Sequence, residues 1–135
     1  MFARILRGEL PCFRVFEDPE TLAFMDIMPR CEGHTLVIPK APVRNILDAT
    51  PAHLAATMRT TRSISLALMK AFGAQGVTIQ QFNEAAGGQD VFHLHFHVLP
   101  RWAGQKLKPH TGQLADKDVL EQHAQKIRAA LLGAT

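Results

Sequence analysis

One stretch limits what this chain can fold into more than any other. In residues 92–98, Phe-His-Leu-His-Phe-His-Val, apolar side chains and histidines alternate, so that histidines occupy positions 93, 95 and 97. Strict alternation is typical of a half-buried β-strand, in which successive side chains point to opposite faces. At a rise of about 3.3 Å per residue, neighbouring histidines would lie roughly 6–7 Å apart. We therefore expect a strand here, with a row of three imidazoles on one face.

Three interpretations of the histidine row are open. A chance cluster is the simplest, but three histidines in register are a poor way to make a strand soluble. A metal site is the second, because imidazole is the commonest metal ligand. However, Cys12 and Cys31 lie far apart and form no Cys-x-x-Cys pair. The third is phosphate chemistry, because a neutral imidazole can attack phosphorus and protonated ones can donate to phosphate oxygens.

The residues on either side of the histidines favour phosphate chemistry. Gly87 and Gly88 precede the stretch and would let the backbone approach a ligand and present N–H groups to an anion. A glycine pair alone indicates only a turn, but this one leads directly into the histidines. Pro100 and Arg101 then end the stretch with a fixed cation.

Residues 93–99, His-Leu-His-Phe-His-Val-Leu, resemble the signature of the histidine triad (HIT) superfamily of nucleotide hydrolases and transferases. Residues 7–11, 22–27 and 33–40 are similar to the family's N-terminal half, in the usual order, so the resemblance covers about residues 1–102. It implies a single HIT domain over residues 1–135 with an α+β fold. We expect a five-stranded, mostly antiparallel sheet, one long helix, a C-terminal helical tail at about 116–132, and a homodimer.

Composition sets limits on the class of protein. A chain of 135 residues with 47% hydrophobic residues suggests one domain with a substantial core. It has no run of about 18 apolar residues, and its N-terminus lacks the order of a signal peptide, so we expect no membrane span. Two unpaired cysteines suggest a reducing cytoplasm. The net charge of +3 suits a small anionic ligand and falls short of the basic stripe expected for nucleic-acid binding.

Hydrophobic periodicity predicts the remaining elements. We expect a short helix over residues 2–7, a hairpin of strands 13–16 and 21–25, and further strands at 34–38 and 76–82. Thr50 and Pro51 are typical of a helix start, and Gly73 of its end, so the long helix should run from 51 to 72. Residues 103–115 read as a loop, before a last helix that Asp116 can cap.

The resemblance implies a purine nucleotide site with a base pocket, a ribose clamp and a phosphate platform. His95 would be the nucleophile, oriented by His93 and His34, with His34 supporting the first triad member, His93. His97 would donate to a phosphate oxygen. Asp26 would accept hydrogen bonds from the ribose hydroxyls, although an ordinary turn aspartate is the alternative from the residues alone.

The other expected nucleotide contacts are spread along the chain. Those of the base pocket are apolar and could equally belong to the core, and those of the phosphate side lie in the glycine loop. They are Phe2, Ile5, Phe24 and Ile27 for the base, and Asn83, Gly88, Gln89, Asp90 and Val91 for the phosphate side.

The chemistry implied is hydrolysis at the α-phosphorus of purine nucleoside phosphoramidates, or of related conjugates, through a nucleotidyl-histidine intermediate. No metal is needed for it. Many bacterial relatives have a Cys-rich N-terminus that helps to bind a structural zinc. This chain has Met1 to Arg4 there, so we expect no such zinc.

Position 90 departs from the family pattern, because it is Asp where many relatives have Ser or Thr. This leaves the branch open. A dinucleoside polyphosphate hydrolase is one alternative, and a non-catalytic nucleotide-binding or scaffold protein is another. A zinc-binding protein built on the histidines is a third. A nucleotidyltransferase is disfavoured, because those relatives usually replace the third histidine, here His97, by Gln.

Overall fold

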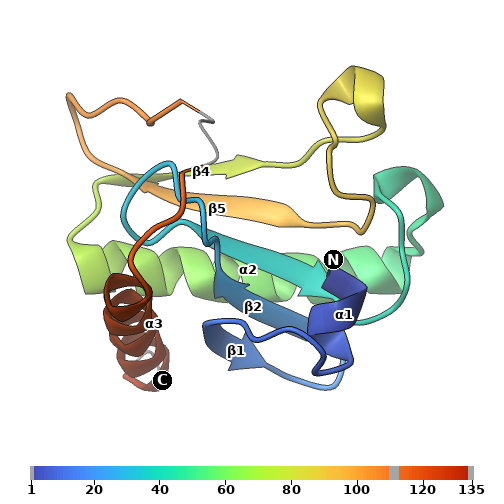
Figure 1. Cartoon of the computed structure of the whole chain (residues 1–135), viewed down its shortest axis with the longest axis horizontal. Coiled ribbons are helices and arrows are strands. Elements are labelled where there is room, and N and C mark those ends of the chain that lie inside the picture. The colour runs from blue at the N-terminus through green and yellow to red at the C-terminus, as the bar shows by residue number, and fades with distance from the viewer. Residues whose placement is uncertain (1, 110–112, 134–135) are drawn as a thin grey trace.

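A five-stranded antiparallel sheet forms the centre of the molecule. The computed structural model describes residues 2–109 and 113–133. The strands are β1 (Arg14–Glu17), β2 (Thr21–Met25), β3 (Thr35–Pro39), β4 (Gly76–Gln80) and β5 (Phe96–Arg101), in the order β1-β2-β3-β5-β4. The helices are α1 (Phe2–Leu6), α2 (Pro51–Phe72) and α3 (Lys117–Leu132), with short 3-10 turns at Ile46–Asp48 and Ala85–Gly87. In Figure 1, α2 runs along one face of the sheet, and α1 lies on the other.

The predicted α+β class is confirmed, and most elements lie within two residues of their predicted bounds. The start of α2 has the chemistry that the sequence indicates. The side chain of Thr50 accepts a hydrogen bond from the backbone N–H of His53, and Pro51 occupies the first helical position. The helix ends at Gly73, whose φ of 58° is in the left-handed region that glycine adopts without a Cβ clash.

The strand predicted over residues 92–98 is the main correction. β5 begins only at Phe96, so His93 and His95 precede it in an irregular segment. The backbone N–H of Leu94 donates to the carbonyl of Val43 at 2.8 Å, a residue of the loop after β3, which draws this segment out of the ladder. The expectation of a half-buried strand is also wrong. Residues 96–100 are all buried, because α1 and the residues after it cover the face opposite α2.

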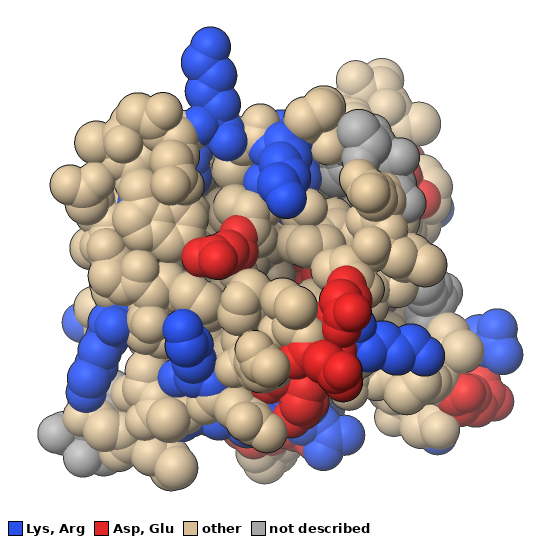
Figure 2. All heavy atoms as spheres, turned by 60° about the vertical axis from the view of Figure 1, so that its left-hand side comes forward, with Lys and Arg blue, Asp and Glu red and all other residues tan. Residues whose placement is uncertain are grey.

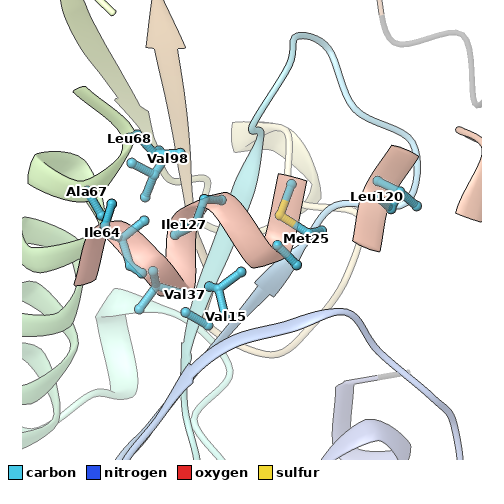
Figure 3. Close-up of a cluster of buried hydrophobic side chains, with 12 residues drawn as sticks. Val15, Met25, Val37, Ile64, Ala67, Leu68, Val98, Leu120 and Ile127 are labelled. Carbon is cyan, nitrogen blue, oxygen red and sulfur yellow. The ribbon is translucent and has the colours of Figure 1, made fainter. Parts of the chain in front are cut away.

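The strand register divides the side chains of the sheet between its two faces. Phe24, Leu36 and His97 are paired across β2, β3 and β5, so they share one face. Phe24 and Leu36 pack with Phe2 of α1 on that face. Their neighbours along the strands, including Val37, point to the other face and pack against α2 and α3, as Figure 3 shows. One face of the sheet is therefore dry core, and the other carries His97.

Charge is mixed on the surface that comes forward in Figure 2. Basic and acidic side chains are interspersed there, and neither sign covers that face alone. Among the described residues, no helix combines the length and the apolar character needed to cross a membrane.

Candidate active site

Four histidines gather beside a cavity on the α1 face of the sheet. His34 lies directly before β3 and is fully buried. His93 and His95 lie in the segment before β5, and His97 is the second residue of β5. All three are less than 10% exposed. The predicted cluster therefore forms, although only its last member belongs to a strand.

The cavity has a volume of about 350 Å³, and most of its wall is apolar. His95 and His97 line it, and among the described residues Asp26 and Asp90 are the only acidic ones in its wall. The remaining lining residues come from α1 and the segment after it, from β2 and the turn that follows, and from β3. They are Phe2, Ile5, Leu10, Pro11, Cys12, Phe24, Met25, Ile27, Met28 and Leu36.

The hydrogen bond of His95 fixes which of its ring nitrogens carries the proton. Its Nδ1 lies 2.7 Å from the backbone carbonyl oxygen of His93. A carbonyl only accepts, so Nδ1 must donate, and in the neutral ring Nε2 is then a bare lone pair. Burial lowers the pKa of His95, an effect partly offset by this carbonyl and by the charge of Asp90. The site therefore holds a neutral imidazole with a nucleophilic Nε2.

His97 is held in the opposite tautomer by a chain of hydrogen bonds. The backbone N–H of Arg30 donates to Nδ1 of His34 at 3.1 Å, so this nitrogen carries no proton. His34 must then carry its proton on Nε2, which lies 3.0 Å from Nδ1 of His97. Nδ1 of His97 accepts, and its proton sits on Nε2. With ring centroids 5.0 Å apart, His95 offers a lone pair beside an N–H donor of His97.

His93 has a supporting place rather than one in the cavity wall. Its Nε2 lies 2.8 Å from the carbonyl oxygen of Pro39, and burial lowers its pKa. Its own carbonyl holds His95. The expected support of His93 by His34 is wrong. Thr35 pairs with Val98, so the preceding His34 lies diagonally across from His97 and not near the start of the segment.

Asp26 connects the cavity to the His34–His97 pair. One carboxylate oxygen accepts the backbone N–H of Met28 at 2.8 Å, and the other lies 3.4 Å from Nε2 of His34. Asp26 lines the cavity together with Phe2, Phe24 and Ile27. The structure thus brings together the residues expected for the base and the ribose.

The glycine loop is organised differently from our expectation. Gln89 is buried, and its amide oxygen accepts from the backbone N–H of Glu84 at 2.8 Å and from Nδ2 of Asn45 at 3.1 Å. Its amide nitrogen donates to the carbonyls of Arg44 and Val91. Asn83 likewise exchanges hydrogen bonds with Gln81 and accepts one from the backbone N–H of Ile46. In this structure both side chains hold the loop together, outside the cavity wall.

The remaining loop residues separate into two groups. Asp90 lines the cavity, whereas Gly88 and Val91 do not. Gly88 has a φ of 98°, and a Cβ there would lie 3.2 Å from the Phe82 ring, so its role is in the turn. Val91 lines a second cavity on the side of His93. Glu84 forms a two-pronged ion pair with Arg44, and this pair lowers the Glu84 pKa to about 2.

Some residues of the cavity wall are not among the predicted site residues. Leu10, Pro11 and Cys12 look like an ordinary connection between α1 and β1, and only the fold brings them to the cavity. Leu36 lies beside His97 because β3 pairs with β5. To predict this position, one would need the strand register, which the sequence does not supply.

One group of described residues could hold a metal ion. The ligand atoms of Asp26, His34 and His97 lie within 4.8 Å of one another. His34 and His97 already share a proton, so a metal would have to displace that hydrogen bond. The second cavity has His93 and Asp48 in its wall, and the described residues around it form no group of three metal ligands.

Fold and site together define a class, that of α+β domains built around a histidine triad. A family model described as HIT domain matches residues 7–104. A Hit-like protein from Bartonella henselae is 49% identical with a TM-score of 0.89, over 96% of this chain and 94% of that one. A Zn-bound histidine triad family protein from Mycobacterium smegmatis is 35% identical with a TM-score of 0.88, over 98% and 93%.

A relative of stated activity is adenylylsulfatase HINT3 of Arabidopsis thaliana. It is 36% identical over 124 residues, which make up 87% of this chain but only 62% of that protein, so the chain spans less than two thirds of its length. This chain belongs to the HIT family, whose members are generally nucleotide-binding hydrolases.

Proposed function

We propose that this protein hydrolyses the P–N bond of purine nucleoside phosphoramidates through a covalent nucleotidyl intermediate on His95. The arrangement of two ring nitrogens supports this proposal. Nε2 of His95 is a bare lone pair because Nδ1 is committed to a carbonyl at 2.7 Å. It stands next to His97, whose Nε2 carries a proton because Nδ1 accepts from His34. A nucleophile beside a hydrogen-bond donor is what transfer of a phosphoryl centre requires.

The reaction has two displacements. Nε2 of His95 attacks the α-phosphorus, and the P–N bond breaks with its electron pair left on the amine nitrogen, which takes a proton from solvent. Water then attacks phosphorus, the P–Nε2 bond breaks, a proton returns to solvent, and the nucleoside monophosphate leaves. Nε2–H of His97 would stabilise the charge that develops on a phosphoryl oxygen. Neither step needs a metal ion.

The cavity supports a nucleotide in one orientation. Its apolar wall, with Phe2, Ile5, Phe24 and Ile27, suits a purine ring. A carboxylate offers about four acceptor positions, so Asp26 can accept from ribose hydroxyls beside its present partners. The α-phosphate would then lie at His95 and His97.

Charge favours phosphoramidates over the alternatives. The described residues of this wall include no Lys or Arg, and Arg44, which lines the second cavity, is paired with Glu84. A dinucleoside polyphosphate carries several negative charges that such a wall would not neutralise. Hydrolysis of adenylyl sulfate is the second candidate, because a 36% identical relative is an adenylylsulfatase. A non-catalytic nucleotide-binding protein is the third.

A substrate panel tests the proposal. Adenosine phosphoramidate, adenylyl sulfate and diadenosine tetraphosphate are compared by kcat/KM, each with and without a chelator. We expect the phosphoramidate to be cleaved fastest, with no effect of the chelator. Rapid quenching and peptide mass spectrometry should find the nucleotidyl group on His95. Absence of turnover with all three substrates, or a clear preference for the tetraphosphate, would contradict the proposal.

We also propose a homodimer formed through β4 and α2. β4 is an edge strand, whose backbone groups can pair with a second copy. Ile79 of β4 is 49% exposed, and Met58, Leu66 and Met69 form an exposed apolar stripe on α2. Light scattering after size-exclusion chromatography should give twice the mass of 14.9 kDa, and Leu66→Glu should give the monomer. A monomeric native protein at micromolar concentration would contradict this proposal.

The two cysteines bear on the location of the protein. Cys12 and Cys31 are free thiols, which fits a reducing compartment. We therefore infer a cytoplasmic protein, to be checked by fractionation of the source cells.

A further inference from the structure

Asp90 is a charged group in the cavity wall that the two-step reaction does not use. It is exposed and lines the cavity with His95 and His97. Its carboxylate makes no hydrogen bond or ion pair with a described residue, whereas Asp26 has the backbone of Met28 and His34 as partners. The carboxylate of Asp90 therefore stabilises no described part of the fold, and it lies in the wall of the candidate active site.

Asp90 lies in the same cavity wall as two of the histidines, His95 and His97. Asp26 lies beside His34, and His34 contacts His97. His97 stacks edge-on against His95, and the charge of Asp90 raises the pKa of His95. Asp90 therefore shares the cavity wall with His95, the ring that would attack the α-phosphorus, and its charge acts there.

The rest of the wall does not balance this charge. Its other residues are apolar, apart from the histidines and Asp26, and none is Lys or Arg. With the base and the ribose against the apolar part, the group attached to the α-phosphorus would lie beside His95, where the charge of Asp90 acts. Low-dielectric walls strengthen the field of an unbalanced charge on a ligand nearby.

We propose that Asp90 selects substrates by the charge of the leaving group. It favours phosphoramidates in which the leaving amine has a second, positively charged group. The inference rests on the proposed phosphoramidase function and adds the substrate class to it. The carboxylate acts through its field on the departing group, and the bonds made and broken are those of the two displacements above. Anionic leaving groups, such as sulfate or a nucleotide phosphate, are disfavoured by the same field.

The test uses three adenosine phosphoramidates that differ only at the end of a two-carbon amine. The amine is 1,2-diaminoethane for the cationic substrate, ethanolamine for the neutral one and taurine for the anionic one. We expect kcat/KM to fall in that order, by about five- to tenfold per unit charge, the size of a one-charge interaction in a partly exposed site. The differences in kcat/KM among the three substrates should become smaller in 0.5 M salt, because ions screen exposed charges.

Asp90→Asn keeps the shape and removes the charge. In this variant the ratio of kcat/KM for the cationic substrate to that for the anionic one should fall by about tenfold or more. Asp118→Asn is the matched control, because Asp118 is an exposed carboxylate in the first turn of the distant α3. It should leave the ratio unchanged.

The outcomes separate the two proposals. Turnover of all three substrates without a charge ranking, or a ranking that Asp90→Asn preserves, would overturn the role of Asp90 and leave the phosphoramidase function standing. No turnover of any of them would overturn the function itself. The salt series on the native protein tests the role of Asp90 without a variant. The role can therefore still be refuted if Asp90→Asn folds poorly.

Discussion

The two pairs of histidines in this site are held by opposite kinds of backbone group. His93 and His95 each face a carbonyl oxygen, of Pro39 and of His93 itself. His34 and His97 form a chain that begins at the backbone N–H of Arg30. A carbonyl forces a ring nitrogen to donate and an N–H forces it to accept. Nε2 is thus a bare lone pair in His95 and a hydrogen-bond donor in His97, and backbone groups determine which of the two it is.

The largest expected effect comes from removing the lone pair. His95→Ala should lower kcat for adenosine phosphoramidate by about four orders of magnitude or more, because no other group can form the intermediate. Binding of adenosine monophosphate, measured by calorimetry, should change by only a few fold. His123→Gln removes a histidine that packs on Phe72 in the interface of α2 and α3, and should leave kcat near the native value. Near-native hydrolysis by His95→Ala would show that His95 is not the nucleophile.

Removing the Nε2–H donor of His97 should lower kcat less than removing His95. His97→Ala deletes the Nε2–H that faces the developing charge, and loss of one such donor typically lowers kcat by about 10²–10³-fold. The intermediate should still form on His95, but more slowly, and rapid-quench measurements would detect it. A loss as large as that in His95→Ala, with no intermediate, would mean that His97 does more than donate a hydrogen bond.

The sequence predicts the parts of this site that depend on spacing, and fails where the backbone departs from a regular strand. Alternation at 93, 95 and 97 correctly indicates that the imidazoles gather, since His97 does lie on a strand. It cannot show that β5 begins at Phe96, because the bond of Leu94 to Val43 depends on a distant loop. The hydrogen bond that sets the tautomer of His95 lies in that same irregular segment.

The loop before the triad shows a second limit. Gln89 and Asn83 have the polar groups of ligand contacts, and we expected them on the phosphate side. In the structure these groups hold Glu84, Arg44 and Ile46 in place. A sequence shows which polar atoms exist but not which backbone groups need them. The α2 helix was easier to predict, because its cap, its first proline and its terminal glycine are all local signals.

A smaller effect is expected from His34, which acts through its neighbour. His34→Ala removes the donor to Nδ1 of His97, so the tautomer with its proton on Nδ1 becomes populated and Nε2–H is lost for part of the time. We expect about a tenfold fall in kcat, less than for His97→Ala. The ¹⁵N chemical shifts of the His97 ring should report mixed tautomers in this variant and a single one in the native protein. Unchanged shifts would limit His34 to a packing role.

The smallest expected effect is a shift of the pH profile, and it tests the state of His95 directly. The neutral ring is the nucleophile, so kcat/KM falls as pH drops through the pKa of His95 in the free enzyme. Burial lowers that pKa below the ordinary value of 6.5, so kcat/KM should stay level above pH 6.5 and fall only at lower pH. The charge of Asp90 raises the His95 pKa. Asp90→Asn should therefore move the acidic limb to lower pH, by less than about one unit.

The phosphoramidate of ethanolamine is the substrate for this measurement, because its leaving group carries no charge of its own. Asp118→Asn serves again as the control, and its profile should coincide with that of the native protein. An acidic limb above pH 6.5 would mean that His95 is not held neutral by burial. A limb that moves to higher pH in Asp90→Asn would mean that the field at Nε2 has the opposite sign, and the role given to Asp90 would fail with it. The first result would also remove the contrast between His95 and His97, since both rings would then be donors at neutral pH.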